Sequence, residues 1–479
     1  MKKRTKILAT IGPSSDTLEQ LERLIRAGVN VFRLNFSHGT HAYHSSVLTL
    51  IRQAMQNTGL VVGVLQDISG PKVRVGKLEN HFFLRNGDTL EFVHDAIIGT
   101  QVKQGHYRVS INQVDILTKM QEGEFIYLCD GNIRAKVESV GKSVICVVQN
   151  SGKLSSNKGV NFPNTHIDID VLTAKDRDDM LWGIANDVDF MAISFVQHAQ
   201  DILNAQAIIE ENGGHQQLFA KIEKFDAVEN IDAILEVSDG IMVARGDLGI
   251  EVPYYEVPAI QKSIIKKANA VSKPVITATQ MLLSMTESET ATRAEISDVA
   301  NAVLDGTDVV MLSEESAVGH NPVLAVETMF NTIRETEKMY DYDKFSNFSM
   351  NDEMDVIHES AVMLADNLNA TALLALTTSG QSAKKLARYR PRKAILAIIH
   401  DERVARSLTI VWGVIPAFLV EKSSLDAMMS QVVKKGLAKG VLENDGCYVL
   451  TAGDPVGVAG TTNSIRVLRE HEMDYLKSL

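Results

Sequence analysis

Gly240-Ile-Met-Val-Ala-Arg-Gly-Asp-Leu-Gly249 is an apolar run that stops abruptly at charged residues, and Leu218-Phe-Ala-Lys-Ile-Glu223, shortly before it, has the same form. Both runs predict buried strands that carry charge where they end. Because successive side chains of a strand alternate between its two faces, Lys221 and Glu223 point the same way. Two carboxylates, a lysine and an arginine at neighbouring strand ends suit a hard divalent cation and a phosphate. The competing interpretation is a pair of surface ion pairs where two loops begin.

The composition is that of a soluble globular protein. The chain has 479 residues, of which 45% are hydrophobic and 23% charged. A chain of this length suggests about two to four domains. The net charge of −12 argues against binding to nucleic acid or to a membrane surface, because both favour a basic face.

Cysteine usage and the N-terminus predict a cytoplasmic protein. Cys129, Cys146 and Cys447 are too widely spaced for a disulfide framework or a metal motif, which fits a reducing compartment. The basic start at Met1 is followed by an apolar run at residues 7–11 that is too short for a signal peptide. No apolar stretch approaches the roughly 18–20 residues of a membrane span.

Strands and helices alternate in two stretches of the chain, before residue 70 and after residue 165. Segments with helical spacing separate the apolar runs; one of them, at residues 16–26, has an Asp16-x-x-Glu19 start and Gly28 as a stop. Eight strand–helix units over about 250 residues favour a (β/α)8 barrel over the alternative, an open doubly wound sheet. The expected strands are residues 5–11, 30–36, 60–66, 190–196, 218–222, 241–244, 274–279 and 309–312.

Two further segments interrupt or follow this pattern. From residue 72 to about residue 150 the chain has short alternating segments and a hairpin turn at Gly141-Lys142, which predict an inserted β domain. After residue 350 a third alternation predicts a small doubly wound α/β domain, joined through a linker at 340–350. We therefore expect a barrel at residues 1–70 and 166–340, a β lid domain at 71–165 and a C-terminal domain at 341–479.

Polar and charged side chains gather where the expected barrel strands end, which is where enzymes of this fold carry their active sites. Each one alone has an ordinary explanation; Asn35 and Ser37, for example, can cap the helix that follows them. Their number is hard to explain by solubility alone, and it predicts one common site. The groups are Thr10, Arg33, Asn35, Ser37, His38, Asp67, Lys221, Glu223, Arg245, Asp247, Thr277, Thr279 and Gln280.

Seven motifs follow one another along the chain: RLNFSHG (33–39), SGPKVR (69–74), KGVNFP (158–163), AKIE (220–223), ARGDLG (244–249), TATQM (277–281) and TRAEISDVANAVLDG (292–306). No single motif is specific, but together and in this order they resemble the pyruvate kinase family. The resemblance implies a (β/α)8 barrel, an inserted small β-barrel lid domain and a C-terminal α/β domain. It also implies an enzyme that uses Mg²⁺ or Mn²⁺ to transfer a phosphoryl group from phosphoenolpyruvate to ADP, giving pyruvate and ATP, usually as a homotetramer.

The resemblance assigns chemistry to the strand ends. Glu223 and Asp247 are similar to the family's Mg²⁺ ligands, and a small number of protein carboxylates is the expected pattern for this cation. Lys221 resembles the catalytic lysine that neutralises charge on the phosphoryl group in flight. Arg33 and Arg74 resemble the arginines that hold phosphates by bidentate contacts, which a lysine cannot copy.

Substrate and nucleotide contacts are implied in the same way. The segment Ala244, Arg245 and Gly246, followed by Asp247, is similar to the one whose backbone N–H groups take the substrate carboxylate. Thr279 resembles the hydroxyl that protonates the enolpyruvate, through water because a threonine hydroxyl is too weak an acid alone. The implied nucleotide contacts are Asn35, His38, Tyr43, Arg74 and Lys158. For His38 an ordinary loop histidine is an equal alternative.

Most members of the family need K⁺, and the resemblance points to Asn35, Ser37, Asp67 and the Ile68 carbonyl as its ligands. In the K⁺-dependent members that this chain resembles, the lid-hinge motif has the form Gly-Pro-Glu, whereas this chain has Gly-Pro-Lys72. A glutamate there adds a negative charge that K⁺ offsets, whereas Lys72 supplies a positive charge itself. We therefore expect that K⁺ is not required. The alternative is that Lys72 points to solvent and K⁺ binds normally.

The C-terminal domain carries a second candidate phosphate site. Small hydroxyls and backbone N–H groups at a helix N-terminus form a phosphate cradle, although an ordinary N-cap loop is the alternative. The position resembles the effector loop of regulated pyruvate kinases. Because Gln381 replaces a basic residue often found there, and the closing loop at residues 453–463 contains no Arg or Trp, we expect a sugar monophosphate or a nucleotide rather than a sugar bisphosphate. The loop residues are Thr377, Thr378, Ser379, Gly380, Gln381 and Ser382.

Two other functions fit parts of this pattern. A lyase or aldolase that handles phosphoenolpyruvate or pyruvate on the same fold would not need an ADP-binding lid. A non-catalytic sugar-phosphate sensor would not need the intact set of Lys221, Glu223, Asp247 and Thr279.

Overall fold

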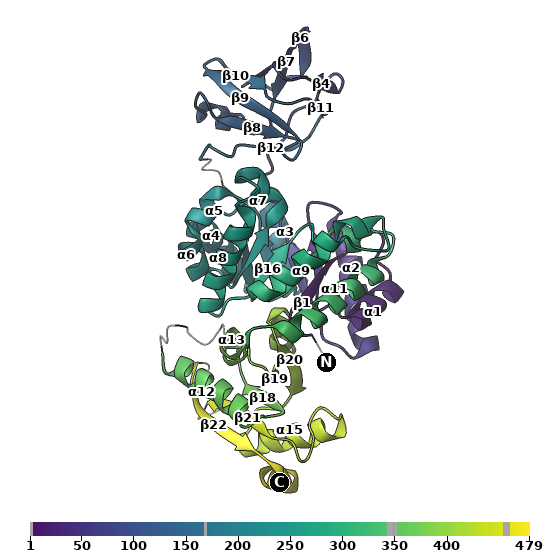
Figure 1. Ribbon diagram of the computed structural model, residues 1–479, viewed down its shortest axis with the longest axis vertical. Helices are drawn as coiled ribbons and strands as arrows, with labels where there is room; N and C mark the ends of the chain where they lie inside the picture. The colour runs from purple at the N-terminus through teal and green to yellow at the C-terminus, as the bar shows by residue number, and fades with distance from the viewer. Residues whose placement is uncertain (1–2, 167–169, 343–347, 349–351, 454–459) are drawn as a thin grey trace.

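The computed structural model describes residues 3–166, 170–342, 348, 352–453 and 460–479. Three bodies follow one another along its longest axis: the barrel lies in the middle, with the β domain at one end and the C-terminal domain at the other (Figure 1). Most of the expected linker and residues 454–459 of the loop that closes the expected effector site lie outside the described residues. Among the described helices, none has the length and apolar character needed to cross a lipid bilayer.

Eight parallel strands close into a ring in the order β1-β17-β16-β15-β14-β13-β3-β2. This closure confirms the (β/α)8 barrel and excludes an open doubly wound sheet. The strands are almost entirely buried, which explains why they appear in the sequence as continuous apolar runs rather than alternating ones. Their bounds are β1 Lys6–Thr10, β2 Val31–Asn35, β3 Gly63–Asp67, β13 Phe190–Ile193, β14 Gln217–Ile222, β15 Gly240–Ala244, β16 Val275–Ala278 and β17 Val309–Leu312.

The helices outside the barrel begin and end at capping residues. The first helix ends at Gly28, whose φ of 117° lies in the left-handed region, as expected. Its expected start at Asp16 is one residue early, because the Thr17 hydroxyl accepts the capping hydrogen bond from the Gln20 N–H. The bounds are α1 Leu18–Ala27, α2 His41–Thr58, α3 Ala174–Ala185, α4 Ala199–Glu211, α5 Phe225–Glu229, α6 Ile231–Val237, α7 Arg245–Glu251, α8 Val257–Ala270, α9 Arg293–Asp305, α10 Glu314–Ala317 and α11 Pro322–Thr336, with 3-10 turns η2 Leu283–Thr286 and η3 Glu337–Met339.

The chain between β3 and α3 forms the expected β domain around a hydrophobic core of its own. Seven strands make one sheet, and β4 and β11 make a separate ribbon, without the closed ring of ladders found in the barrel. The expected hairpin at Gly141-Lys142 joins β9 and β10, which pair with Val140 opposite Val144. Four short strands were not foreseen: β4, β6, β11 and β12. The bounds are β4 Phe82–Leu84, β5 Thr89–Val93, β6 Thr100–Lys103, β7 His106–Ser110, η1 Val114–Thr118, β8 Phe125–Leu128, β9 Ile133–Val140, β10 Ser143–Val148, β11 Gly152–Leu154 and β12 Val160–Asn161.

The C-terminal domain is a five-stranded sheet in the order β20-β19-β18-β21-β22, of which the last strand alone runs antiparallel to its neighbour. Residues 402–410 form the helix α14 followed by a 3-10 turn, and α16 follows the last strand. The bounds are α12 Glu353–Asn367, β18 Ala372–Leu376, α13 Gln381–Arg388, β19 Ala394–Ile399, α14 Glu402–Ser407, η5 Leu408–Ile410, β20 Val414–Leu419, α15 Leu425–Ala438, β21 Tyr448–Gly453, β22 Thr462–Leu468 and α16 Glu470–Ser478.

The C-terminal domain seals the amino end of the barrel. One hydrophobic cluster joins barrel residues such as Phe190 and Phe219 with Leu408 and other residues of the C-terminal domain. At the edge of this cluster Arg390, 1% exposed, donates from both terminal nitrogens to the two Asp308 carboxylate oxygens at 3.0 Å each. Because the amino end is covered, the open end of the barrel is its carboxyl end, which faces the β domain.

We expect the Arg390→Met variant to lose about 3–5 kcal/mol of unfolding free energy, because it leaves the Asp308 carboxylate buried without its cation. The measurement is urea unfolding followed by tryptophan fluorescence, to which Trp182 and Trp412 contribute; the Trp412 ring lies 5.1 Å from the Arg390 guanidinium. The control is Lys267→Met, which breaks an ion pair with Asp232 on the barrel surface and should cost less than about 1 kcal/mol. Equal losses in the two variants would contradict a stabilising role for the buried pair.

Candidate active site

A cavity of about 620 Å³ lies at the carboxyl ends of the barrel strands and extends under the β domain. Two of its lining residues, Lys72 and Arg74, come from the β domain, so the site is built by two parts of the chain. Most of the residues expected to share a site do so. Those that line the cavity are Thr10, Arg33, Asn35, Ser37, His38, Asp67, Lys72, Arg74, Lys221, Glu223, Ala244, Asp247 and Thr279.

A chain of ion pairs runs across the floor of the cavity. Arg33 Nε donates to Asp67 Oδ2 at 2.6 Å, and Lys221 Nζ donates to Asp67 Oδ1 at 3.0 Å. The same ammonium lies 2.9 Å from Glu223 Oε1. All three barrel strands that carry these groups are neighbours or near neighbours in the ring, β2, β3 and β14. Arg33 and Asp67 meet because β2 and β3 are neighbours, and Lys221 reaches Asp67 across β13, the one strand between β14 and β3.

The charges on this floor control one another. Burial raises the pKa of Asp67, but the Arg33 and Lys221 cations outweigh burial and hold that pKa below its ordinary value. Burial lowers the pKa of Lys221, yet Asp67 and Glu223 raise it well above its usual range, so the ammonium stays charged. The result is a positive charge on a mostly buried side chain, where it acts more strongly on an incoming anion than it would at the surface.

Glu223 and Asp247 form a pair of carboxylates that suits a hard cation. Burial raises the pKa of Glu223, Lys221 opposes this, and the negative charge of Asp247 raises it further, with a net increase. Among the described residues, no group of three or more His, Cys, Asp or Glu side chains is arranged to hold a metal ion. A cation here would thus have two protein carboxylates and take its other ligands from water or substrate, which is the usual pattern of Mg²⁺.

Two residues that the sequence did not single out, Ser194 and Phe195, hold the side chains of Lys221 and Glu223 in place. The Ser194 hydroxyl accepts from Lys221 Nζ at 2.6 Å and donates to the Ile68 carbonyl at 2.6 Å. The Phe195 N–H donates to Glu223 Oε2 at 3.1 Å, and Phe195 has a φ of 60°. The apolar run suggested a strand through residue 196, but β13 ends at Ile193, so Ser194 and Phe195 belong to the loop that faces the site.

Thr279 and Arg245 meet behind the cavity. The Thr279 hydroxyl accepts from the Gly246 N–H at 2.8 Å and donates to the Ala278 carbonyl at 2.6 Å. The Arg245 guanidinium is turned away, donating to the Thr279 carbonyl and to Asp298, each at 2.7 Å. Of the residues expected at the substrate, Arg245 and Gly246 therefore line a neighbouring pocket of about 590 Å³ and not the main cavity.

Comparison with known proteins decides the family. The family model described as pyruvate kinase, barrel domain, matches residues 2–326, and that of the pyruvate kinase alpha/beta domain matches residues 355–468. The chain belongs to the pyruvate kinase family. It is therefore a phosphotransferase of glycolysis.

Individual relatives agree with this family over nearly the full chain. The pyruvate kinase of Clostridium acetobutylicum is 41% identical over 472 residues, covering 97% of this chain and 99% of the relative. That of Geobacillus stearothermophilus is 41% identical, covering 98% of this chain and 80% of the relative. The crystal structure of a pyruvate kinase from Cryptosporidium parvum superimposes with a TM-score of 0.91 at 34% identity, covering 98% of this chain and 96% of that one.

Two of the nucleotide contacts implied by the pyruvate kinase resemblance lie away from the cavity wall. The Tyr43 hydroxyl donates to Asp16 at 3.0 Å, and Lys158 is an exposed residue of the β domain. Neither lines the cavity in this structure. The distance of Lys158 from the site depends on where the β domain sits above the barrel, because that domain carries it, whereas Tyr43 lies on the barrel helix α2.

All four groups expected to bind K⁺ already have partners in the protein. Both Asp67 oxygens face cations, and the Ile68 carbonyl accepts from Ser194. The Asn35 side-chain oxygen accepts from the Ser37 N–H at 3.1 Å, and the Ser37 hydroxyl donates to the Ser69 hydroxyl at 3.3 Å.

The expected effector loop of the pyruvate kinase fold lies between β18 and α13. Gly380 has a φ of 89°, and its N–H donates to the Thr377 hydroxyl at 2.9 Å. The Ser382 hydroxyl lies 2.7 Å from the Thr462 hydroxyl of β22. These contacts fold the loop onto the start of α13.

Proposed function

We propose that the chain transfers the phosphoryl group of phosphoenolpyruvate to ADP, giving pyruvate and ATP. The observation that supports this most is the mixed set of charges in one cavity: four cations, Arg33, Lys72, Arg74 and Lys221, next to the carboxylate pair Glu223 and Asp247. A phosphoryl group in transfer carries negative charge on its oxygens, and fixed cations in a site poor in water stabilise it.

Lys221 is proposed as the catalytic cation. Its ammonium is held by Asp67, Glu223 and Ser194, which leaves it little freedom to move. Arg33 donates to Asp67 from Nε, so its terminal nitrogens remain directed toward Thr10 and the cavity. Arg74 enters from the β domain and is braced by the Asn157 carbonyl at 2.9 Å. We assign these three side chains to the phosphate of the substrate.

The cation site is assigned to Glu223 and Asp247. Bound there, Mg²⁺ or Mn²⁺ would neutralise charge on the oxygens of the substrate and of the phosphoryl group. Crowding of the two carboxylates supports this assignment, because Asp247 raises the pKa of Glu223. The backbone of Ala244 to Asp247 is proposed to receive the substrate carboxylate, with Gly246 allowing a close approach.

Thr279 is proposed to assist the protonation of the enolpyruvate. When the phosphoryl group leaves the enol oxygen for an ADP oxygen, the methylene carbon of enolpyruvate needs one proton to become the methyl group of pyruvate. Thr279 lines the cavity with its backbone at a φ of 71°, so the surrounding structure holds it in an unusual conformation. Its hydroxyl would pass the proton from a water molecule.

The domain at 71–165 is proposed as a lid that covers ADP. It contributes Lys72, Arg74 and Lys158, and the barrel loops contribute Asn35, His38 and Tyr43. Closing the lid would exclude water, which otherwise competes with ADP for the phosphoryl group. The barrel domain is proposed to comprise residues 1–70 and 166–340, and the C-terminal domain residues 341–479.

We also propose that catalysis does not require K⁺. Lys72 lines the same cavity as Asp67, and the expected K⁺ ligands have partners within the protein. A second cation at this point would repel both Lys72 and Lys221.

Regulation is proposed at the loop from Thr377 to Ser382, where a sugar monophosphate or a nucleotide would bind. Gln381 at the start of α13 supplies no charge, so one phosphate suits the loop better than two. On the basis of the family resemblance, we also propose that the protein is a homotetramer in the cytoplasm.

The first test is pyruvate formation by the purified chain with phosphoenolpyruvate and Mg²⁺, in the presence and absence of ADP. We expect ATP and pyruvate in equal amounts, and a kcat loss of roughly a thousandfold in Lys221→Met, which removes the cation from the phosphoryl group. Lys267→Met, at the barrel surface, is the control. Pyruvate release without ADP would favour a lyase, and binding of sugar phosphates without turnover would favour a sensor.

The K⁺ proposal predicts that activity in K⁺-free tetramethylammonium buffer stays within about twofold of that with K⁺. The Lys72→Glu variant should acquire a K⁺ requirement, because it turns a positive charge at the cavity into a negative one. Lys77→Glu makes the same charge change at an exposed position of the lid and should remain independent of K⁺. If the unmutated protein lost its activity without K⁺ and regained it when K⁺ was added, the proposal that Lys72 replaces the cation would be refuted.

The effector proposal predicts that one sugar monophosphate or nucleotide raises the velocity at sub-saturating phosphoenolpyruvate by lowering its KM. The measurement uses a panel of sugar monophosphates, sugar bisphosphates and nucleotides at equal concentration. A bisphosphate should be weaker, because its second phosphate meets no cation in the loop. Strong activation by a bisphosphate alone would contradict this prediction.

A further inference from the structure

The chain leaves the barrel for the lid at Ser69 and Gly70, a point we call the outgoing hinge. Gly70 has a φ of 70°, and a Cβ atom there would come within 2.6 Å of the Phe195 ring and 3.1 Å of Ser194 Cβ. Ser194 and Phe195 in turn hold Lys221 and Glu223. The outgoing hinge is thus packed directly on the residues that position the catalytic groups.

A fully buried carboxylate, Asp176, holds this hinge. Asp176 Oδ1 accepts from the Gly70 N–H at 3.1 Å, and Oδ2 accepts from the Thr173 N–H at 2.9 Å and from the Thr173 hydroxyl. Asp176 is 0% exposed. One oxygen of this carboxylate therefore caps its own helix, α3, and the other fastens the outgoing hinge. Because α3 is the first barrel helix after the lid, the hinge is tied to the element that receives the returning chain.

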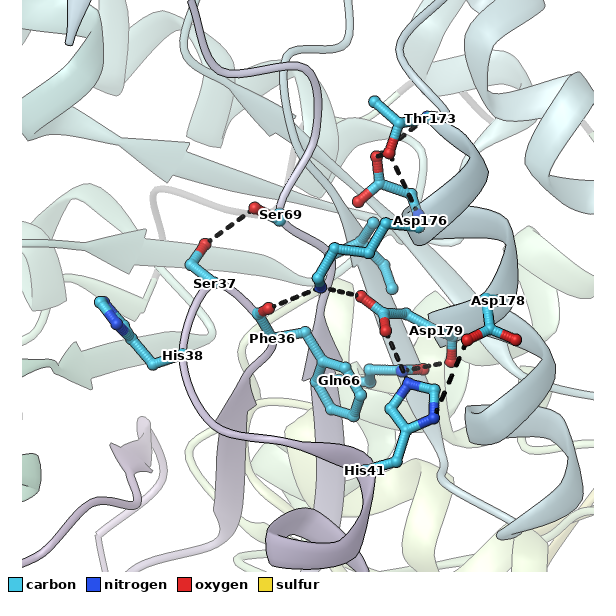
Figure 2. A network of polar contacts seen from close by, with 12 residues as sticks. Phe36, Ser37, His38, His41, Gln66, Ser69, Thr173, Asp176, Asp178 and Asp179 are labelled. Carbon is cyan, nitrogen blue, oxygen red and sulfur yellow. Dashed lines mark hydrogen bonds and ion pairs between the residues drawn. The ribbon is translucent and has the colours of Figure 1, made fainter. Parts of the chain in front are cut away.

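The same turn of α3 also holds the loop after β2. Lys175 Nζ donates to the Phe36 carbonyl at 2.9 Å and pairs with Asp179, which also lies 2.7 Å from His41 Nε2. The Lys175 side chain is 60% exposed, so this contact is weaker than that of Asp176. Figure 2 shows the contacts between Asp176 and Thr173 and the Ser37–Ser69 hydrogen bond, which joins the loop to the outgoing hinge.

These contacts form a closed circuit. The first turn of α3 fastens Gly70 on one side and Phe36 on the other, and the neighbours of those two residues, Ser69 and Ser37, bind each other. Movement of the outgoing hinge relative to the loop would break at least one of the contacts. Rotation of the lid is then confined to the chain beyond Gly70, where Lys72 and Arg74 enter the cavity.

We propose that Asp176 is a positioning residue that fixes the outgoing hinge of the lid, and that it sets the register of Lys72 and Arg74 over the barrel floor. The inference deepens the proposed function and rests on it. Asp176 touches no reacting atom; it acts through Gly70. Its loss should therefore weaken the contacts made by the lid more than the contacts made by the barrel floor.

The test compares Asp176→Asn with Thr173→Val. An amide has one acceptor oxygen, so Asp176→Asn deprives either the Gly70 N–H or the Thr173 N–H of its partner. Thr173→Val damages the same helix cap, by removing the hydroxyl that accepts from the Asp176 N–H, but leaves the hinge contact intact. We expect Asp176→Asn to raise the KM for ADP about tenfold and the KM for phosphoenolpyruvate by a smaller factor, because Arg74 is the one lid residue among the three cations assigned to the substrate phosphate. Thr173→Val should leave both KM values unchanged.

Hydrogen exchange of residues 69–75 is measured on the same proteins and does not depend on activity. Faster exchange at the outgoing hinge in Asp176→Asn alone, together with the split in KM, supports the proposal. Faster exchange without the split, a similar KM increase in both variants, or unchanged exchange in Asp176→Asn would each overturn it. Absence of ADP-dependent turnover in the parent protein would instead sink the proposed function, while the exchange result would still report on the contact.

Discussion

A buried ammonium between two carboxylates is the interaction on which the rest of this structure depends. Burial alone would favour a neutral lysine, and Asp67 and Glu223 reverse that preference for Lys221. Arg33 then balances the second oxygen of Asp67. The cluster is compact enough that removing any member leaves an uncompensated charge in a site poor in water, a situation that costs several kcal/mol. This mutual dependence explains why the charges occur together at the strand ends.

The two ends of the barrel serve opposite purposes. At the amino end, apolar side chains of the barrel and of the C-terminal domain merge into one cluster, and the buried charges of Arg390 and Asp308 neutralise each other beside it. At the carboxyl end, charges face a cavity that is open to ligands. A sealed end gives the strands a rigid base, and a rigid base lets the open end hold charged groups in fixed positions.

Three residues at the open end have a strained backbone. Phe195, Thr279 and Gln280 all have positive φ, although none is a glycine, and each directly follows or nearly follows a barrel strand. Conformations of this kind cost on the order of 1–3 kcal/mol each, and they persist only where the surroundings determine them. Here the hydrogen bonds from the Phe195 N–H to Glu223 and from the Gly246 N–H to the Thr279 hydroxyl help to hold Phe195 and Thr279 in these conformations. The strain therefore accompanies the placement of side chains that line the cavity.

The sequence by itself determined the elements of the fold and the charged residues at the strand ends, because buried parallel strands leave continuous apolar runs and their ends leave abrupt changes of polarity. Only the tertiary structure decided which groups meet. The apolar run that contains Ser194 and Phe195 predicts a strand through residue 196 and gives no sign that the strand stops at Ile193. Neither does Asp176 stand out, since an acidic residue three positions after a threonine is an ordinary helix cap. Its second oxygen reaches Gly70 only after the intervening residues, about 100 of them, have folded as a separate domain and returned to the barrel, a contact that no local pattern encodes.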